Sequence, residues 1–280
     1  TSTAPGGAAN VAANVSGLGA ECFLVGVVGD DKEAEILPEI LSQINVSTEF
    51  LIKTQNRPTT VKTRVIAHSQ QIVRIDREKK IPLDDFEENQ VWRIISGLLE
   101  RVEIIVLSDY GKGVLTENLL ARLINYGNDN GKFVLIDPKG KDFTKYKGAT
   151  ALTPNRFEAA EVYQLEDTSP EVIKKAGDKL MSELLLKNLL ITQGEAGMML
   201  FQNNFDPIHL TAFARKVYDV TGAGDTVIAC LAVALGSGMS FEEAAKLSNI
   251  AAGLAVEQIG TTAISLEMLE NALSSDLKLN

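Results

Sequence analysis

The sequence predicts an α/β fold in which helices cover both faces of a mostly parallel sheet, with a small β flap beside it. Apolar segments typical of buried strands alternate with helical segments through most of the 280 residues. Three short segments of alternating polarity interrupt this pattern at about residues 48–76 and predict an antiparallel flap. No linker rich in Gly, Ser or Pro and no internal repeat divides the chain. We therefore expect one domain, residues 1–280, with the flap as its lid.

Bulk composition narrows the range of partners. With 45% hydrophobic residues the chain can bury a sizeable core, and its formal charge of −10 argues against nucleic acid or an anionic membrane as the main partner. No apolar run reaches the length of a membrane span and no signal peptide stands at the start, so we expect a cytoplasmic protein. Cys22 and Cys230 lie in apolar segments at no metal-like spacing and are expected to be buried thiols.

The chain begins with a helix at residues 8–17 whose side chains are so small that another element must pack closely against it. Gly6 and Gly7 precede this helix, and Asn10 and Asn14 lie one turn apart on one face of it. These groups suit hydrogen bonding to a polyhydroxylated ligand. From the residues alone, a tightly packed helix with capping amides is the preferred explanation.

A strand at residues 21–28 and a helix at 31–43, in which Pro38 should cause a kink or an early end, lead into the flap strands at 48–53, 59–67 and 71–75. On the flap, Lys62 and Arg64 share one face of a strand and Arg74 stands on the next strand. Cationic strand residues usually only protect an exposed edge. Three together also suit an acceptor that already carries a phosphate group.

Polar residues follow two strand ends in the middle of the chain. After a helix at 86–101, the strand at 103–107 ends in Ser-Asp-Tyr-Gly-Lys-Gly, and the strand at 133–136 ends in Asp-Pro-Lys-Gly. The carboxyl edge of a parallel sheet is where ligands bind, so Asp109, Lys112 and Lys139 are binding candidates. For Asp109 and Lys112 a turn with a solvated ion pair is nearly as good an explanation.

Asn155 and Glu158 lie just after the strand at 151–153, on one side of the first turn of a helix. Their spacing is also that of a capping box. The segment Gln-Gly-Glu-Ala-Gly at 193–197 joins strands at 188–192 and 198–202 and by itself indicates a hairpin. Further elements are expected as a helix at 170–186, strands at 208–210 and 216–218, and helices at 240–258 and 265–273.

The segment Val217–Thr226 reads Val-Tyr-Asp-Val-Thr-Gly-Ala-Gly-Asp-Thr and precedes an apolar run fit for a buried helix. Gly222, Ala223 and Gly224 thus stand at a helix N-terminus, where unpaired N–H groups and the helix dipole attract phosphate. Asp225 would repel such a ligand unless it performs chemistry, so it reads as a base that takes a proton from a hydroxyl. Stabilisation of the first helical turn explains this carboxylate equally well on the tetrapeptide alone.

Several segments resemble motifs of the ribokinase-like, or phosphofructokinase B, family of carbohydrate kinases. They are residues 6–12, 71–76, 107–113, 136–140, 152–155 and 218–226, so the resemblance runs nearly from end to end. It implies a ribokinase-like three-layer sandwich with a mostly parallel central sheet and a small β lid. It also implies an enzyme that uses ATP and Mg²⁺, with a monovalent cation as a further candidate cofactor.

The resemblance is greatest to the branch of this family that acts on D-glycero-β-D-manno-heptose 7-phosphate. It implies phosphorylation of the anomeric hydroxyl to the 1,7-bisphosphate, in ADP-heptose and lipopolysaccharide core synthesis, by a protein that forms a homodimer. The resemblance assigns catalysis to Asp225 as the base, with Gly222, Ala223 and Gly224 stabilising the transferring group. The implied acceptor-binding residues are Gly6, Gly7 and Asn10. The candidates Lys62, Arg64, Arg74, Asp109 and Lys112 complete the predicted acceptor site. The implied nucleotide-binding residues are Asn155, Glu158, Thr192, Gly194, Gly197 and Asn249, with Glu158 organising Mg²⁺ through water.

Two alternatives remain open. One is another kinase of the same fold that acts on a ketose, pentose or nucleoside, and the other is a sugar- or nucleotide-binding protein without turnover. The absence of a P-loop, of the protein-kinase motifs and of a dinucleotide fingerprint disfavours other nucleotide-binding classes. Members of the family begin with a strand and a Gly-Asp pair that are not found before Gly6, and no nucleotidyltransferase motif precedes Asn280. We therefore expect kinase chemistry alone, in a stand-alone enzyme or one half of a bifunctional one.

Overall fold

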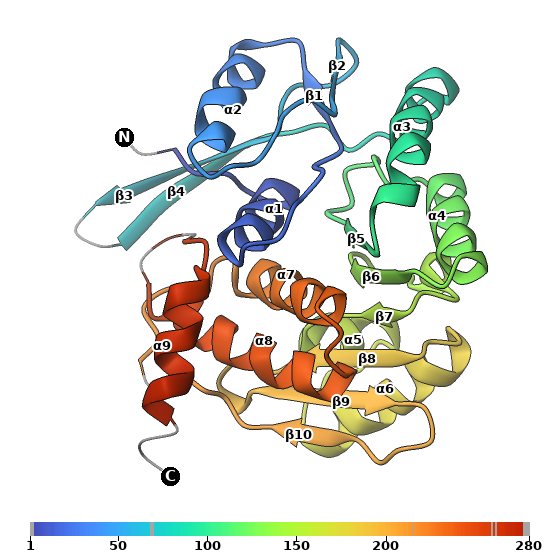
Figure 1. The fold of residues 1–280 in the computed structure, drawn as a ribbon, viewed down its shortest axis with the longest axis vertical. Coiled ribbons are helices and arrows are strands. Elements are labelled where there is room, and N and C mark those ends of the chain that lie inside the picture. The colour runs from blue at the N-terminus through green and yellow to red at the C-terminus, as the bar shows by residue number, and fades with distance from the viewer. Residues whose placement is uncertain (1–2, 68–69, 215, 259, 261, 277–280) are drawn as a thin grey trace.

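A six-stranded sheet forms the centre of the protein in the computed structural model, which describes residues 3–67, 70–214, 216–258, 260 and 262–276. Its strand order is β10-β9-β8-β7-β6-β5 (Figure 1). Four strands are parallel, and β9 and β10 continue the sheet antiparallel. Their bounds are β5 Ile104–Ser108, β6 Phe133–Asp137, β7 Ala151–Leu152, β8 Asn188–Thr192, β9 Met198–Gln202 and β10 Ile208–Leu210. The predicted mostly parallel sheet is confirmed.

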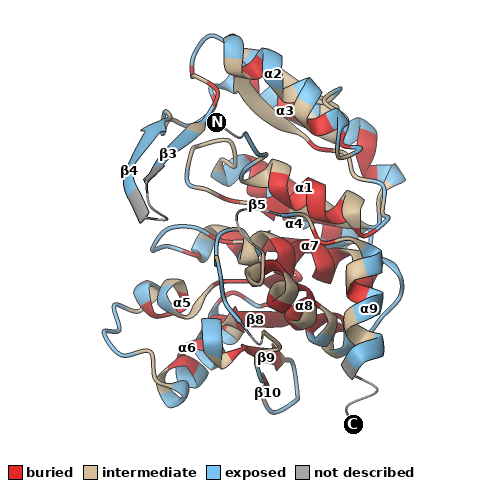
Figure 2. Cartoon of the chain, turned by 90° about the vertical axis from the view of Figure 1, so that its left-hand side faces the viewer, coloured by how far each residue is buried: buried red, intermediate tan, exposed pale blue. Residues whose placement is uncertain are grey.

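Helices cover both faces of this sheet and make three layers. Successive residues of one strand enter different cores, because side chains alternate across a sheet. In β6, Val134 and Ile136 join the core beneath α4, α5 and α6, whereas Leu135 joins the core beneath α1, α7 and α8. The bounds are α1 Ala8–Gly17, α4 Glu117–Asp129, α5 Arg156–Val162, α6 Pro170–Glu183, α7 Ala223–Gly236, α8 Phe241–Val256 and α9 Leu266–Asp276. Figure 2 shows α7 as the most buried of these helices, as its apolar sequence requires.

The smaller β elements differ from the expected flap. Its first strand, β2 (Leu51–Thr54), pairs in parallel with β1 (Gly26–Gly29) and forms a separate two-stranded sheet. Only β3 (Val61–Ala67) and β4 (Gln70–Arg77) form the antiparallel hairpin that projects from the body (Figure 1). The prediction of three antiparallel strands was therefore wrong. Leu51 and Ile52 pack against two of the cores, which favours pairing with the body over pairing with the hairpin.

Two of three further elements differ from the sequence prediction. Helix α2 (Lys32–Ser42) continues through Pro38, so the proline does not end it. Helix α3 (Asp85–Leu98) begins at a capping box formed by Asp84 and Glu87. The predicted strand at residues 216–218 is wrong, because the chain there is irregular and attaches to the end of α8 through the Tyr218 N–H and the Val256 carbonyl oxygen. Within the described part of the chain, no helix combines the length and apolar character needed to cross a bilayer.

Two helix-interior glycines give a matched test of the packing. A Cβ added at Gly177 in α6 would lie 2.1 Å from the buried Phe201 ring of β9, whereas one added at Gly97 in α3 would meet nothing within 4 Å. We expect Gly177→Ala to destabilise the protein by about 1–3 kcal/mol through overpacking. Gly97→Ala should stabilise it by about 0.5–1 kcal/mol, because alanine loses less backbone entropy in a helix. Urea unfolding measures both, and equal effects would contradict the packing described here.

Candidate active site

The carboxylate of Asp225 lies where three elements meet. It belongs to the first turn of α7, which begins after Gly222 in the left-handed conformation, with φ +84°. Its Oδ2 accepts a hydrogen bond of 2.8 Å from Asn10 Nδ2 of α1, and its Oδ1 accepts one of 2.6 Å from the Tyr110 hydroxyl, which follows β5. Both oxygens therefore bond to side chains of other elements. Capping of its own helix does not account for this placement.

Burial raises the pKa of both Asp225 and Tyr110. Loss of water around Asp225 raises the pKa of its carboxyl group, and the hydrogen bonds from Asn10 and Tyr110 partly offset that rise. Burial, followed by the charge of Asp225, raises the pKa of Tyr110 far above its ordinary value. Tyr110 thus stays protonated and donates, and the raised pKa makes the Asp225 carboxylate a stronger base than an exposed aspartate.

Open space lies beside three of the predicted site glycines. A Cβ added at Gly224 would meet no atom within 4 Å, and the same holds for Gly6 and Gly194. At the start of α7 the Ala223 N–H donates to the Val220 carbonyl oxygen at 3.3 Å, so it is not a free donor. The N–H groups that follow it have no partner within the helix and lie beside the open space at Gly224. This arrangement is a cradle for an anion beside Asp225.

Helix α1 is fixed to α7 by its second asparagine. Asn14 is fully buried, donates to the Asn10 carbonyl oxygen, and accepts hydrogen bonds from the Ile264 N–H at 3.0 Å and the Thr226 hydroxyl at 3.3 Å. Asn10 is then directed to Asp225. A side chain at Gly7 would lie 3.2 Å from the Tyr110 ring, so this glycine lets the tyrosine approach. Gly6, Gly7 and Asn10 therefore lie in the segment that contacts Asp225 and Tyr110, and their predicted contacts with the sugar stay predictions.

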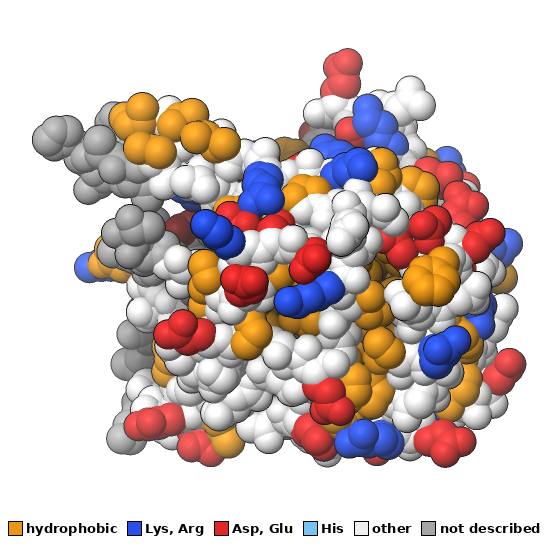
Figure 3. Space-filling model, turned by 90° about the horizontal axis from the view of Figure 1, so that it is seen from above, with side chains coloured by type: hydrophobic (Ala, Val, Ile, Leu, Met, Phe, Trp, Pro, Cys, Tyr) orange, Lys and Arg blue, Asp and Glu red, His pale blue; other side chains and the backbone are white. Residues whose placement is uncertain are grey.

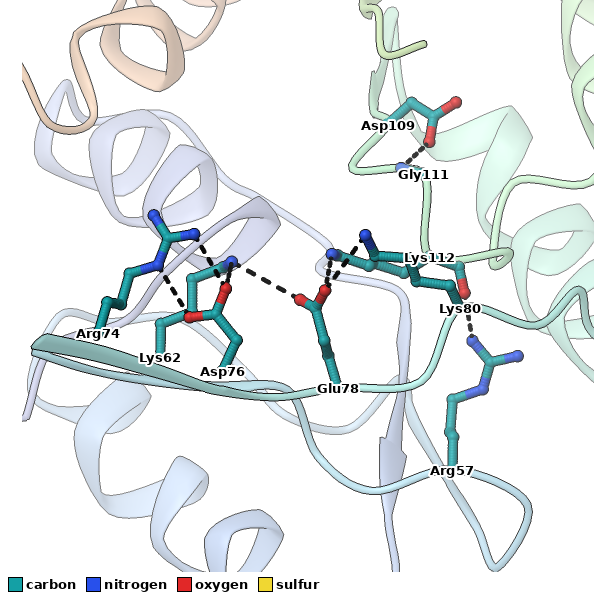
Figure 4. Close-up of polar contacts among 9 residues, drawn as sticks. All are labelled: Arg57, Lys62, Arg74, Asp76, Glu78, Lys80, Asp109, Gly111 and Lys112. Carbon is teal, nitrogen blue, oxygen red and sulfur yellow. Dashed lines mark hydrogen bonds and ion pairs between the residues drawn. The ribbon is translucent and has the colours of Figure 1, made fainter.

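Two polar residues of the loop after β5, Asp109 and Lys112, make contacts in different parts of the structure. Asp109 is buried: its Oδ1 accepts from the Gly111 N–H at 2.7 Å, and its Oδ2 accepts from Lys145 Nζ at 2.7 Å and the Tyr146 hydroxyl at 2.6 Å. These contacts give Asp109 a role in shaping the loop, and its predicted contact with the acceptor stays a prediction. Lys112 instead extends towards the lid, where its ammonium group bonds to Glu78 (Figure 4).

The predicted lid cations gather on one face of the hairpin. The register pairs Lys62 with Asp76 and Arg64 with Arg74, so all four side chains leave the same face. Lys62 and Arg74 both bond to Asp76, at 3.2 Å and 2.9 Å, as Figure 4 shows. Arg64 contributes to lowering the pKa of Asp219, in the segment before α7, although hydrogen bonds from Thr221 are the main cause. Two of the three predicted lid cations thus pair with Asp76 on the lid itself, and Arg64 acts on the segment before α7.

Asn155 and Glu158 form the capping box that their spacing allows. The Asn155 side chain accepts from the backbone N–H groups of Phe157 and Glu158, and Glu158 Oε2 accepts from the Asn155 N–H at 3.0 Å. Glu158 Oε1 accepts from Lys139 Nζ at 2.7 Å. The Glu158 carboxylate therefore takes part both in the capping box and in an ion pair with the candidate Lys139.

Sequence reasoning passed over Asp137, which ends β6 beside these groups. Burial raises its pKa well above the ordinary value, and the charges of Asp225 and Glu158 add to that rise. Its position at a parallel strand's carboxyl end, next to the candidate Lys139, was the available signal. Of the described residues, no three His, Cys, Asp or Glu side chains make a direct metal cluster.

The remaining predicted nucleotide-site residues lie around the ends of β8, β9 and β10. The Thr192 N–H donates to the Pro154 carbonyl oxygen at 3.0 Å, which places Thr192 beside Asn155. Gly194 is open, but a Cβ at Gly197 would lie 1.9 Å from the Leu210 carbonyl oxygen, so Gly197 is required by the close approach of two backbones. Asn249 donates to the Thr211 carbonyl oxygen at 2.6 Å and lines a cavity of about 480 Å³.

Comparison with known proteins adds independent findings. The sequence model of the pfkB family carbohydrate kinases matches residues 1–268. The chain is 45% identical over 282 residues to the bifunctional protein HldE of Chromohalobacter salexigens, and 44% identical over 269 residues to that of Proteus mirabilis. These alignments cover 97% and 96% of the chain and 56% of each relative. The chain thus spans about half the length of the curated relatives it matches.

Solved structures match in fold. Arabidopsis thaliana ribokinase, determined with ribose and ATP, aligns with a TM-score of 0.77 at 22% identity and covers 95% of this chain and 86% of that one. Escherichia coli phosphofructokinase-2, determined with potassium, aligns with a TM-score of 0.78 at 20% identity and covers 96% and 87%. The predicted ribokinase-like fold is therefore confirmed.

The Tyr110 hydrogen bond can be tested without any assay of activity. Tyr110→Phe removes the donor to Asp225 Oδ1 and leaves the ring in place, so we expect the pKa of Asp225 to rise further. Carbon NMR of the labelled carboxyl group, followed through a pH titration, measures this. Tyr163→Phe removes a similar bond to Glu183 on a distant surface and serves as control. An unchanged or lowered pKa in Tyr110→Phe would show that the bond does not act on Asp225.

Proposed function

Because the chain belongs to the pfkB family of carbohydrate kinases, it is a phosphotransferase with a sugar hydroxyl as acceptor, and we propose that Asp225 is its catalytic base. One observation carries the proposal: the Asp225 carboxylate is held by Asn10 and Tyr110 at the open start of α7. There it accepts the proton of the attacking hydroxyl. The N–H groups of Gly222 and Gly224, on either side of Ala223, stabilise the charge on the transferring phosphoryl group.

ATP is proposed as the phosphoryl donor. Gly194 leaves open space for a polyphosphate chain near Thr192 and Asn155, and the cavity beside Asn249 suits an aromatic base. The solved ribokinase with ATP has the same fold, which supports this choice. The potassium in the phosphofructokinase-2 structure likewise supports a monovalent cation as a further cofactor.

Mg²⁺ fits the donor set next to Glu158. Burial is the main cause of the raised pKa of Asp137, and the charges of Asp225, Glu158 and Asp109 add to it, so several carboxyl groups lie close together in this region. Carboxylate oxygens and water are the ligands that Mg²⁺ prefers, and a water-mediated contact to Glu158 agrees with the absence of a direct three-ligand cluster among the described residues. When bound, the ion neutralises charge on the phosphate oxygens. Lys139 holds Glu158 in position through their ion pair.

The proposed acceptor is D-glycero-β-D-manno-heptose 7-phosphate, phosphorylated at its anomeric hydroxyl within ADP-heptose and lipopolysaccharide core synthesis. Two observations support it. The relatives are named bifunctional protein HldE, and the lid presents Lys62, Arg64 and Arg74 on one face, with Lys112 bonded to Glu78 at the end of the lid. A cationic cluster of this kind suits a phosphate group already on the acceptor. The sugar hydroxyls would then bond near Gly6, Gly7 and Asn10.

Domain organisation is proposed from the sheet edges. Of the described strands, β5 pairs only with β6 and β1 only with β2, so both edges carry free backbone groups. We propose that residues 1–280 are one kinase domain and that the additional first strand of its family fits between these edges.

A homodimer through the lid is proposed as the assembly. Val65, Val73 and Ile75 share the hairpin face opposite the cations, and Ile75 is 58% exposed. Figure 3 shows hydrophobic side chains gathered on the projecting hairpin. An isolated two-stranded hairpin gains stability when another surface covers its apolar face. A second copy of this chain offers a matching apolar face.

The base assignment predicts the effect of one substitution. Asp225→Asn keeps the size of the side chain but accepts no proton, so we expect turnover to fall about 10²- to 10⁴-fold while ATP binding persists. A coupled assay of ADP release with heptose 7-phosphate measures turnover, and calorimetry measures binding. Near-normal turnover would overturn the assignment.

The acceptor is tested by a panel. Heptose 7-phosphate should give the largest kcat/KM, ahead of ribose, fructose 6-phosphate and adenosine, because only a suitably placed phosphate reaches the lid cations. Preference for another member identifies a different kinase of this fold. ATP binding with no turnover on any acceptor, in the full-length protein, would instead indicate a binding protein.

The assembly is tested on the apolar lid face. Ile75→Asp buries a charge in the proposed interface, so we expect a monomer where the unmodified chain is a dimer. Sedimentation equilibrium measures the mass. Ile36→Asp, at an exposed site on α2, is the control and should leave the mass unchanged. A dimer that persists in Ile75→Asp would place the interface elsewhere.

A further inference from the structure

Glu78 lies at the centre of the cationic cluster. It follows β4 on the segment that leaves the lid, and its side chain is only 13% exposed. Lys112 Nζ bonds to its Oε1, and the ammonium groups of Lys62 and Lys80 lie 3.6 Å from its oxygens. Figure 4 shows these three lysines converging on one carboxylate from the lid, the following segment and the loop after β5. The hydrogen bond from Lys112 is the main cause that lowers the pKa of Glu78, so the group is ionised at neutral pH.

The backbone around this cluster is held without Glu78. Arg57 donates from one guanidinium nitrogen to the Lys112 carbonyl oxygen at 2.9 Å and from another to the Ile81 carbonyl oxygen at 2.8 Å. The Leu83 N–H also donates to the Gly113 carbonyl oxygen at 3.0 Å. The two segments that carry Lys80 and Lys112 are thus joined by other bonds. The Glu78 carboxylate therefore adds negative charge to the cluster, and other bonds join the two segments.

Charge and hydrogen bonding in the cluster are incomplete. Lys62, Arg74, Lys80 and Lys112 carry four positive charges against the two carboxylates of Asp76 and Glu78. Glu78 Oε2 is buried and accepts no hydrogen bond from the described residues. A carboxylate satisfies three ammonium groups less well than a phosphate dianion does, because phosphate presents three acceptor oxygens and twice the charge.

We propose that Glu78 is an internal substitute for the acceptor's phosphate group, which fills the space among Lys62, Lys80 and Lys112 until a phosphate dianion displaces it. This rests on the proposed function in one respect, that the acceptor already carries a phosphate. Displacement costs the ion pairs of Glu78, so free inorganic phosphate binds weakly. A phosphate attached to a sugar gains further binding from the sugar hydroxyls and overcomes that cost. Glu78 is therefore a specificity-determining residue.

The proposal predicts a gain of anion binding on removal of a charge. Glu78→Gln keeps the side chain's size and leaves three ammonium groups without their carboxylate. Calorimetric titration with inorganic phosphate at low salt should give a Kd lower by about tenfold than in the unmodified protein, with a steeper dependence on salt. Lys112→Met added to Glu78→Gln should abolish the gain. Glu183→Gln, which breaks the surface pair with Lys179, is the matched control and should change nothing.

The opposite result overturns the proposal. If Glu78 only tethers the lid, its replacement loosens the cluster, and phosphate binds as weakly as before or more weakly. Should Glu78→Gln fail to fold, Glu78→Asp provides the test: its shorter side chain cannot maintain the bond to Lys112, so a smaller gain of the same sign is expected, and no gain rejects the proposal.

This titration needs no turnover, which separates it from the proposed function. A gain of phosphate binding without activity on heptose 7-phosphate retains the anion site and rejects that acceptor. Activity on heptose 7-phosphate with unchanged phosphate affinity retains the acceptor and rejects the role of Glu78.

Discussion

The pair of hydrogen bonds that Asp225 accepts from Asn10 and Tyr110 is the constraint on which the site depends. A buried carboxylate is costly unless donors satisfy it, and here the donors come from positions 215 and 115 residues away in the chain. The fold must therefore hold α1, α7 and the loop after β5 in one arrangement. The buried apolar length of α7 and the bonds of Asn14 to Thr226 and Ile264 supply that rigidity. The packing that builds the core therefore also fixes the position of the Asp225 carboxylate.

The sequence predicted those parts of the molecule that depend on local pattern. Strand-helix alternation indicated the layered sheet, and the glycines at 222 and 224 indicated an open helix start. Polar residues at strand ends led to Asn155 and Lys139. The parallel pairing of β1 with β2 was missed because period-two patterning does not reveal a strand's partner. A capping box and a ligand contact also share one spacing, so Glu158 could not be assigned to either from its neighbours alone.

Other features were inaccessible because they are long-range side-chain contacts. Nothing near Asp109 in the sequence indicates that it turns inward to Lys145 and Tyr146, although Lys112, three residues on, turns towards the lid. Asp137 resembles any strand-end aspartate until Asp225 and Glu158 are placed beside it. Electrostatic roles of this kind follow from which carboxylates the fold brings together, and residue spacing carries no information about that.

One end of the lid is bonded to the body of the protein, whereas its outer part has an exposed apolar face. At the base, Asp31 accepts hydrogen bonds from the Thr59 N–H at 2.9 Å and the Thr59 hydroxyl at 2.6 Å, and from Arg77 at 3.0 Å. These bonds fix the start of β3 and the end of β4 to the body, so Lys62 keeps a defined position relative to Lys112. The cluster around Glu78 is thereby preorganised for an anion, because no lid movement is needed to assemble it. Farther out, Val73 and Ile75 lack cover on their face of the hairpin. The anchored end of the hairpin therefore carries its charged residues in fixed positions, whereas its apolar face farther out is exposed among the described residues.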